Sequence, residues 1–68
     1  MEDPLYLVDK ALDDYKMHKY KIALTKVNAA LAVSPNLDVA LHTKALILGK
    51  LGRYVEAADL YQRMLDLC

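Results

Sequence analysis

Few side chains in this chain of 68 residues could bind a metal ion or act as a nucleophile. There are two histidines, His18 and His42, and one cysteine, Cys68. Neither histidine has a second ligand at the spacing that zinc sites use, and no His, Cys and Asp cluster resembles a dinuclear site. A structural or surface role is therefore expected for both histidines, and no metal site or cofactor is predicted.

Catalytic groups are also not evident in the pattern. Asp13 and Asp14 are adjacent acids, but neighbouring positions of a helix point to different sides, so a solvated face is expected rather than an acid–base pair. The chain has no Gly-rich phosphate loop and no nucleophile–base pair. Cys68 could join two chains on oxidation, although an incidental role is the simpler interpretation. We therefore predict that the protein is not an enzyme and has no catalytic residues.

The charge pattern excludes two further classes of partner. Nine basic and nine acidic residues give a formal net charge of zero, and the basic residues are scattered. Binding to nucleic acid or to an anionic membrane surface normally depends on a clustered basic face, so neither is predicted. Apolar runs such as the one at 45–49 are too short to span a bilayer. With one cysteine and no visible leader, a cytoplasmic location is expected.

The spacing of apolar residues predicts four helices and no strands, hence an all-α fold in one domain, 1–68. The first helix is expected from about Pro4 to Met17, with Asp3 as its cap, and the second from Tyr20 to Val33. Asn36 is a plausible N-cap for the third helix, and Gly52 should end that helix at a positive φ. The fourth helix then carries an apolar stripe of Tyr54, Ala57, Ala58, Tyr61, Met64 and Leu65.

An internal repeat organises these helices. When the chain is compared with itself, shifted so that Leu7 lies on Leu41, eight positions are identical, and they are mainly small or apolar. We call this shift the repeat offset. The pairs are Leu7 and Leu41, Lys10 and Lys44, Ala11 and Ala45, Leu12 and Leu46, Lys16 and Lys50, Tyr20 and Tyr54, Ala23 and Ala57, and Leu31 and Leu65.

The repeated residue types indicate how the helices should pack. The alanines are small where two helices would cross closely, and the two tyrosines are expected to fill the space beside each turn. A two-helix unit cannot bury its apolar face alone, so the units should stack.

These residues resemble the signature of the tetratricopeptide repeat family. The second unit matches in Ala45, Gly52, Tyr54, Ala57, Tyr61 and Leu65, and the first in Ala11, Tyr20, Ala23, Ala30, Leu31 and Pro35. The first unit departs from the family pattern at the turn, where His18 stands in place of glycine. The resemblance implies an α-solenoid of four antiparallel helices in two stacked units, repeat one at about 4–37 and repeat two at about 38–68.

The resemblance also implies a binding surface, because members of this family bind peptides or helices on the concave surface formed by the first helix of each unit. The matching positions are Leu5, Val8, Leu12, Tyr15, Lys16, Val39, His42, Leu46, Gly49 and Lys50. Some members clamp an acidic peptide tail with Lys and Asn, but the residues here include Val8, Leu12 and Leu46, which cannot neutralise a carboxylate. This groove is apolar, so the expected partner is an amphipathic helix or an apolar segment of a protein.

Two alternatives to an external ligand stay open. A single core of this size rarely supplies more than about 3–5 kcal/mol, and helical repeats normally need three or more units. The expected last helix has no polar helix after it, which would leave Leu60, Met64 and Leu67 exposed. The chain could therefore be a structural part of a longer helical-repeat protein, or a unit that associates with copies of itself.

Overall fold

The chain folds into four helices and contains no strand within the residues that the computed structural model describes, which are 3–67, with side chains described up to residue 66. The helices are α1 (Pro4–Lys16), α2 (Tyr20–Val33), α3 (Asp38–Lys50) and α4 (Tyr54–Leu67). The predicted all-α helical-repeat fold is confirmed, and the helix ends lie close to the predicted ones. Cys68 lies outside the described residues.

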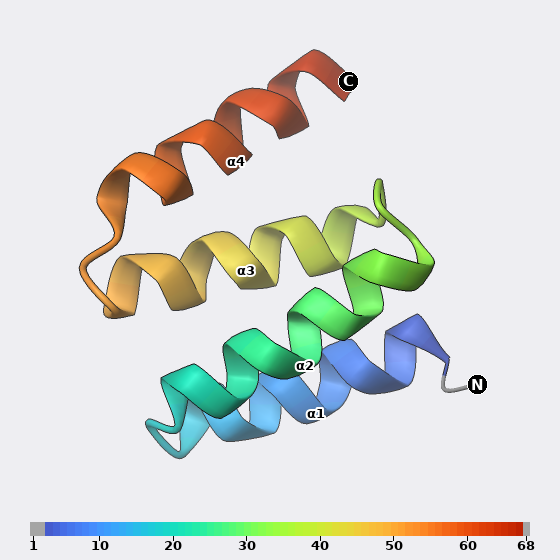
Figure 1. Cartoon of the computed structure of the whole chain (residues 1–68), viewed down its shortest axis with the longest axis vertical. Coiled ribbons are helices and arrows are strands. Elements are labelled where there is room, and N and C mark those ends of the chain that lie inside the picture. The colour runs from blue at the N-terminus through green and yellow to red at the C-terminus, as the bar shows by residue number, and fades with distance from the viewer. Residues whose placement is uncertain (1–2, 68) are drawn as a thin grey trace.

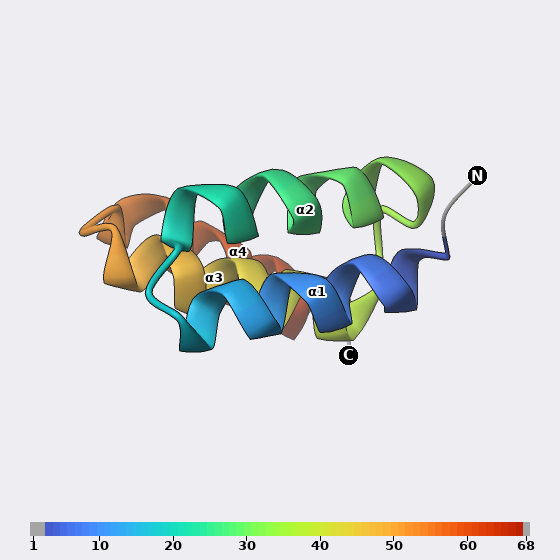
Figure 2. The ribbon, with the colours of Figure 1, turned by 90° about the horizontal axis from the view of Figure 1, so that it is seen from below.

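The helices form two hairpin units, α1–α2 and α3–α4, which pack side by side (Figure 1). The α3 helix packs against both α1 and α2, and Figure 2 shows α1 and α2 as separate antiparallel helices on one side of α3. Over residues 3–67, α4 packs against α3 and against no other helix. Consequently α3 lies inside the fold, and α4 forms one edge of it.

Of the two predicted N-caps, the one at Asp3 is confirmed and the one at Asn36 is wrong. The Leu5 N–H donates to the Asp3 side chain at 2.9 Å, as predicted. Asn36 is not the N-cap of α3: the cap position is held by Leu37, whose side chain makes no capping hydrogen bond. The Asn36 side chain instead accepts a hydrogen bond from Arg63 at 3.3 Å. The guanidinium thus ties the loop between the two units to α4.

The two hairpin turns have the same hydrogen-bonding pattern at equivalent positions of the repeat. In the first turn the Lys19 N–H donates to the Asp14 carbonyl at 2.8 Å, and the His18 N–H donates to the Tyr15 carbonyl at 3.0 Å. This is a Schellman motif, in which the residue after the helix adopts a left-handed conformation. The second turn repeats it, from Arg53 to Leu48 at 2.8 Å and from Gly52 to Gly49 at 3.1 Å.

The left-handed residue of each turn is the one that the repeat alignment pairs. Gly52 has a φ of 77°, as predicted, and His18 has a φ of 62°. A side chain in this region costs roughly 1–2 kcal/mol, which glycine avoids. The His18 ring is held by a hydrogen bond between Nδ1 and the Tyr20 hydroxyl at 2.7 Å. The first turn therefore has the same geometry as the second in spite of the substitution of its glycine.

The two glycines provide a matched test of this geometry. We expect Gly52→Ala to destabilise the protein by about 1 kcal/mol, because the positive φ strains any L side chain. Gly49→Ala should stabilise it by about 0.5–1 kcal/mol, because alanine is the better residue inside a helix. Among the described residues, a Cβ atom at either position would have no atom of another segment within 4 Å, so steric clashes do not enter. Urea titrations of both variants by circular dichroism would measure the difference, and shifts of the same sign would contradict it.

The core lies where α3 contacts the first unit. Four alanines of the repeat, Ala11, Ala23, Ala45 and Ala57, are all buried and allow close helix packing. Thr43 and Ile47 of α3 are 3% and 0% exposed. They are buried because α3 packs against three helices and is therefore covered from several sides.

The acidic pair in α1 differs from its predicted role. Asp13 is exposed, but the Asp14 side chain is 13% exposed and forms an ion pair with Lys26 of α2 at 2.6 Å. At the repeat offset, the second unit has Leu48 and Leu60 in place of Asp14 and Lys26. The first unit thus joins its two helices with a charged pair where the second has an apolar one.

None of the four helices combines the length and the hydropathy that crossing a lipid bilayer requires; this holds for residues 3–67.

Candidate protein-binding site

The residues predicted to form the groove differ widely in exposure. Leu5 and Val39 are 54% and 46% exposed, and Lys16, His42 and Lys50 also face solvent. Leu12, Tyr15, Leu46 and Gly49 are half-buried. Val8 is only 4% exposed and belongs to the core, so it offers almost no surface to a partner, and we leave it out of the candidate site.

Four of these residues lie together around a hollow of about 550 Å³. The hollow is formed by α1, α3 and α4, and we call it the tyrosine hollow. The predicted residues in its lining are Tyr15, Leu46, Gly49 and Lys50. Five further residues complete it, namely Ala45, Tyr54, Ala57, Ala58 and Tyr61.

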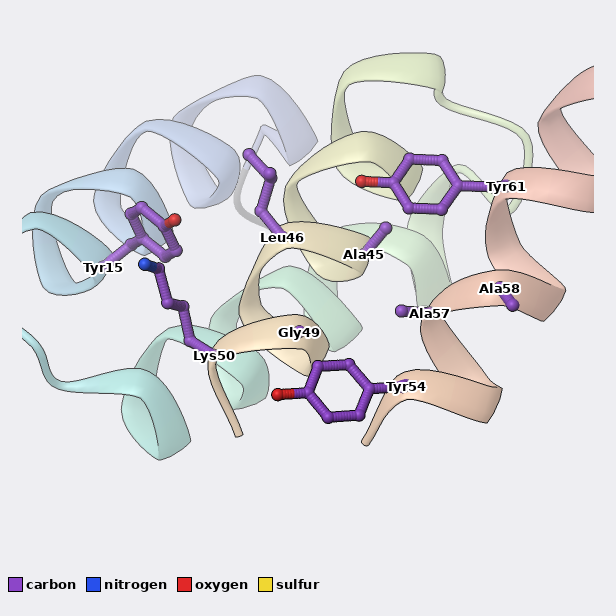
Figure 3. Close-up of a pocket in the computed structure, with 9 residues that line it drawn as sticks. All are labelled: Tyr15, Ala45, Leu46, Gly49, Lys50, Tyr54, Ala57, Ala58 and Tyr61. Carbon is purple, nitrogen blue, oxygen red and sulfur yellow. The ribbon is translucent and has the colours of Figure 1, made fainter. Parts of the chain in front are cut away.

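The side chains in Figure 3 show how the tyrosine hollow is built. Tyr54 and Tyr61 extend from α4 toward α3, on either side of Ala57. Ala45 and Gly49 present little or no side chain from α3, so the space between the two tyrosines stays open. Lys50 extends toward Tyr15 of α1 and supplies the one charged group of the lining. An apolar hollow with a single cation suits a partner that contributes apolar side chains.

The role expected for Tyr54 is wrong, while that of Tyr20 agrees with the structure. Tyr20 is half-buried, packs against the core and stacks edge-on against Tyr15 with a 5.6 Å centroid distance. Tyr54 is 71% exposed and lines the tyrosine hollow. The two tyrosines have the same position in their units, but only the first unit is covered by a further helix.

The exposure of other α4 residues also differs from the prediction. Leu60 and Met64 are half-buried, although they were expected to be exposed, and the side chain of Leu67 lies outside the described residues. Leu65, by contrast, is 69% exposed. His42 of the predicted groove stacks edge-on with Tyr61 at a centroid distance of 6.5 Å. The predicted groove on α3 and the missed α4 residues therefore form adjoining parts of one surface.

The position of the hollow can be recognised from the sequence by comparing the sizes of the side chains that the repeat offset pairs. Gly49 stands where the first unit has Tyr15, and Ala58 where it has Leu24. Two large side chains are thus absent from the second unit. Matching of identical residues overlooks such positions, because the hollow arises where the two units differ.

The turn beside the tyrosine hollow carries two charged residues, which form an ion pair with each other. Arg53 donates hydrogen bonds to the Glu56 carboxylate, one of them from Nη2 to Oε1 at 2.8 Å. These hydrogen bonds lower the pKa of Glu56 and raise the pKa of Arg53 from their ordinary values. Both side chains are in water, so the pair contributes little to stability. Lys50 is the one charged residue that lines the hollow.

No group of three or more His, Cys, Asp or Glu side chains within the described part of the chain could hold a metal ion. The lining of the tyrosine hollow offers apolar contacts and hydrogen bonding by tyrosine hydroxyls, with one ammonium group at its edge.

The comparisons with known proteins give a relative of much greater length. The chain is 37% identical over 65 residues to "DnaJ protein P58IPK homolog A" of Oryza sativa subsp. japonica. The aligned segment covers 96% of this chain but only 14% of the rice protein. No protein-family model and no solved structure matches the chain. The chain is therefore a helical repeat similar to one segment of a much longer DnaJ protein.

Proposed function

We propose that this chain is a non-catalytic protein-binding module of two tetratricopeptide repeats. It binds a helical or apolar segment of a partner protein along the first-helix surface of Leu12, Tyr15 and Leu46 and in the adjoining tyrosine hollow. The observation that carries this proposal is the hollow itself, an open apolar space of about 550 Å³ where three helices meet. Pockets that bind ligands combine such apolar walls with a few polar groups, here the tyrosine hydroxyls and Lys50.

Membership of the repeat family is supported by two independent observations. The eight identities at the repeat offset include the small residues of both helix crossings, which are buried. The two turns share their hydrogen bonds and their left-handed residue at the same offset. The rice DnaJ protein supports a role as a module, because a short segment of it corresponds to the whole fold described here.

The proposal predicts that Leu46→Asp strongly weakens peptide binding. Peptides selected from a displayed random library on the 68-residue chain would serve as ligands, with affinities measured by fluorescence anisotropy. Leu46 is half-buried in the lining, and a carboxylate there would be desolvated against an apolar ligand, so we expect a loss of at least about tenfold.

The matched control for this experiment is Val55→Asp. Val55 is 77% exposed on α4, and an acid in the first helical turn is compatible with the helix. Its affinity should equal that of the unaltered chain, and circular dichroism should show the same helicity for both variants. If the Leu46→Asp variant bound the peptides as tightly as the unaltered chain, the proposed binding surface would be wrong.

A second candidate function is a purely structural one, as part of a longer helical-repeat protein. The observation that favours it is the small share, 14%, of the rice relative that the chain spans. In that case the displayed library would yield no peptide whose binding depends on Leu46.

A further inference from the structure

The fold gathers basic side chains that are scattered along the sequence. Both hairpin turns lie at one end of the molecule, whereas α1 and α3 begin, and α2 and α4 end, at the other (Figure 1). We call the end with the two turns the turn end. Its exposed lysines, from the last turns of α1 and α3 and from the start of α2, are Lys16, Lys19, Lys21 and Lys50. Lysines of both units are thus brought to one end of the molecule.

Few acidic groups oppose these four lysines. The ion pairs among the described residues join Lys26 to Asp14 and Arg53 to Glu56, and neither pair contains a lysine of the turn end. Asp14 and Glu56 are thus neutralised within their own pairs. Asp13, near the end of α1, is exposed and offsets one of the four lysines. The turn end therefore carries a net positive charge, although the formal net charge of the chain is zero.

The turn end also contains a hollow of about 360 Å³, which we call the turn hollow. Its lining residues are His18, Lys19, Tyr20, Lys21, Ile22 and Leu51. Leu51 comes from the second unit and the others from the first, so the hollow lies where the two units meet. Ile22 is 50% exposed, and Leu51 is half-buried. The turn hollow thus combines apolar side chains with two ammonium groups, and none of its lining residues is acidic.

His18 adds a polar ring to this lining in a backbone conformation that favours glycine. Its φ is 62°, and the second unit has Gly52 at the equivalent position. The ring is oriented by the hydrogen bond between Nδ1 and the Tyr20 hydroxyl. When that hydroxyl donates to Nδ1, the ring proton is on Nε2, which can then donate to a carboxylate. A strained position that glycine would hold without cost indicates a use for the imidazole in the hollow.

The turn end is open for a reason that does not depend on adjoining segments of sequence. His18, Lys19 and Lys21 are exposed although α3 packs against both helices of their unit. A further unit packed beside α4 in the same manner would leave the second turn open for the same reason. A segment attached before α1 or after α4 would start at the opposite end of the molecule (Figure 1). The turn end is therefore a surface that packing between units leaves free.

The chemistry of this surface fits an acidic segment of a protein. Carboxylates form charge-assisted hydrogen bonds with ammonium groups, and the net positive charge attracts an acidic partner from a distance. Lys19 and Lys21 lie beside the apolar Ile22 and Leu51 in one hollow. A segment that alternates acidic residues with an apolar one can therefore satisfy both parts of the lining at once.

Other anionic partners fit the turn end less well. Nucleic acid is bound through phosphate contacts along an extended basic track. The opposite end of this molecule instead carries exposed acids, which are Asp3, Asp38 and Asp66. An anionic membrane is attracted by the same lysines, but it is flat and would leave the turn hollow unfilled.

We propose that the turn end binds an acidic segment of a partner protein, whose carboxylates contact Lys19 and Lys21 and whose apolar side chain enters the turn hollow against Ile22 and Leu51. Lys16, Lys50 and His18 supply further charge and hydrogen bonding at its edge. This inference goes beyond the proposed function, because the surface is separate from the one that contains Leu46.

Two peptides with blocked ends test the charge rule by isothermal titration calorimetry at low ionic strength. The acidic peptide is Glu-Asp-Leu-Glu-Asp, and its uncharged counterpart is Gln-Asn-Leu-Gln-Asn. We expect the acidic peptide to bind the 68-residue chain at least about tenfold more tightly. Its affinity should fall at least about tenfold in the double variant Lys19→Gln with Lys21→Gln. The control is Lys10→Gln with Lys44→Gln, which removes the same charge away from the turn hollow and should change the affinity less than about threefold.

A third peptide, with serine in place of the leucine, tests the role of the turn hollow. It should bind at least about threefold more weakly than the leucine peptide, because serine buries no apolar surface against Ile22 and Leu51. The Ile22→Ser variant should lose this preference. Circular dichroism should show the same helicity for all variants.

Equal effects of the two double variants would overturn the inference, because attraction would then depend on net charge alone. Equal binding of the leucine and serine peptides would also overturn it. The same holds if vesicles of phosphatidylcholine and phosphatidylserine, or a single-stranded oligonucleotide, bound through Lys19 and Lys21 while the acidic peptide did not. A dimer in sedimentation that the Lys19 and Lys21 double variant dissociates would identify a second copy as the occupant and would overturn it too.

The proposed function is tested separately from this inference. Peptides from the displayed library that depend on Leu46 should bind the Lys19→Gln with Lys21→Gln variant as tightly as the unaltered chain. This outcome would show that the proposed function survives even where the acidic peptide fails to bind.

Discussion

Replacement of Ile47 by alanine should leave the protein largely unfolded at 25 °C. Ile47 is 0% exposed and belongs to the core that α3 shares with α1 and α2. Truncation of a buried isoleucine to alanine costs about 2–5 kcal/mol, because the lost contacts leave a cavity. A chain of this size rarely has more than about 3–5 kcal/mol in total. Circular dichroism at 222 nm during urea and thermal unfolding would measure the effect.

The control for this prediction is Val39→Ala in the same helix. Val39 is 46% exposed, and alanine favours the helix slightly, so the midpoint of unfolding should change little. If the Ile47→Ala variant melted like the Val39→Ala variant, α3 could not be the helix that holds the two units together.

The second large effect concerns the ion pair between Asp14 and Lys26. Lys26→Leu should destabilise the protein by about 2 kcal/mol, because it leaves a carboxylate that is 13% exposed without its partner. Loss of one partner from a fully buried pair costs roughly 3–5 kcal/mol, and the smaller value here allows for solvent around Lys26, whose side chain is 37% exposed. The measurement is the free energy of unfolding in urea.

The second unit indicates how to rescue this variant. Leu48 and Leu60 occupy the positions of Asp14 and Lys26, and both line one hollow between α3 and α4. The double variant Asp14→Leu with Lys26→Leu should therefore regain the stability of the unaltered chain to within about 1 kcal/mol, since buried ion pairs often tolerate apolar replacement. Lys21→Leu, at an exposed position of α2, serves as the control. A double variant as unstable as Lys26→Leu would show that the two units pack differently at this point.

The helix ends and the repeat could be predicted from the sequence because their causes are local. Asp3 caps α1 through a residue two positions away, and Gly52 ends α3 through hydrogen bonds within one turn. The repeat offset is a property of the sequence itself. The pairing of His18 with Gly52 follows from that offset, and the structure confirms it in the φ values of both residues.

The cap predicted at Asn36 failed for a reason that is not local. Its side chain accepts a hydrogen bond from Arg63, which is far along the chain on α4, and its place at the helix start is taken by Leu37. The burial of Asp14 is a similar case, since its partner Lys26 lies on another helix. Both outcomes depend on which helices meet in space.

The candidate site shows most clearly which features follow from the sequence and which follow only from the tertiary structure. The sequence by itself determined the four helices and their repeat, and it predicted a first-helix surface that includes Leu46 and Lys50. Only the tertiary structure decided that Val8 is covered, that Tyr54 is open and that a hollow lies over Gly49. The physical reason is that helix formation and chain reversal depend on neighbours within a few residues, whereas the exposure of a side chain depends on whether another helix lies over it. Tyr20 and Tyr54 have the same local sequence role, and α3 covers only the unit to which Tyr20 belongs.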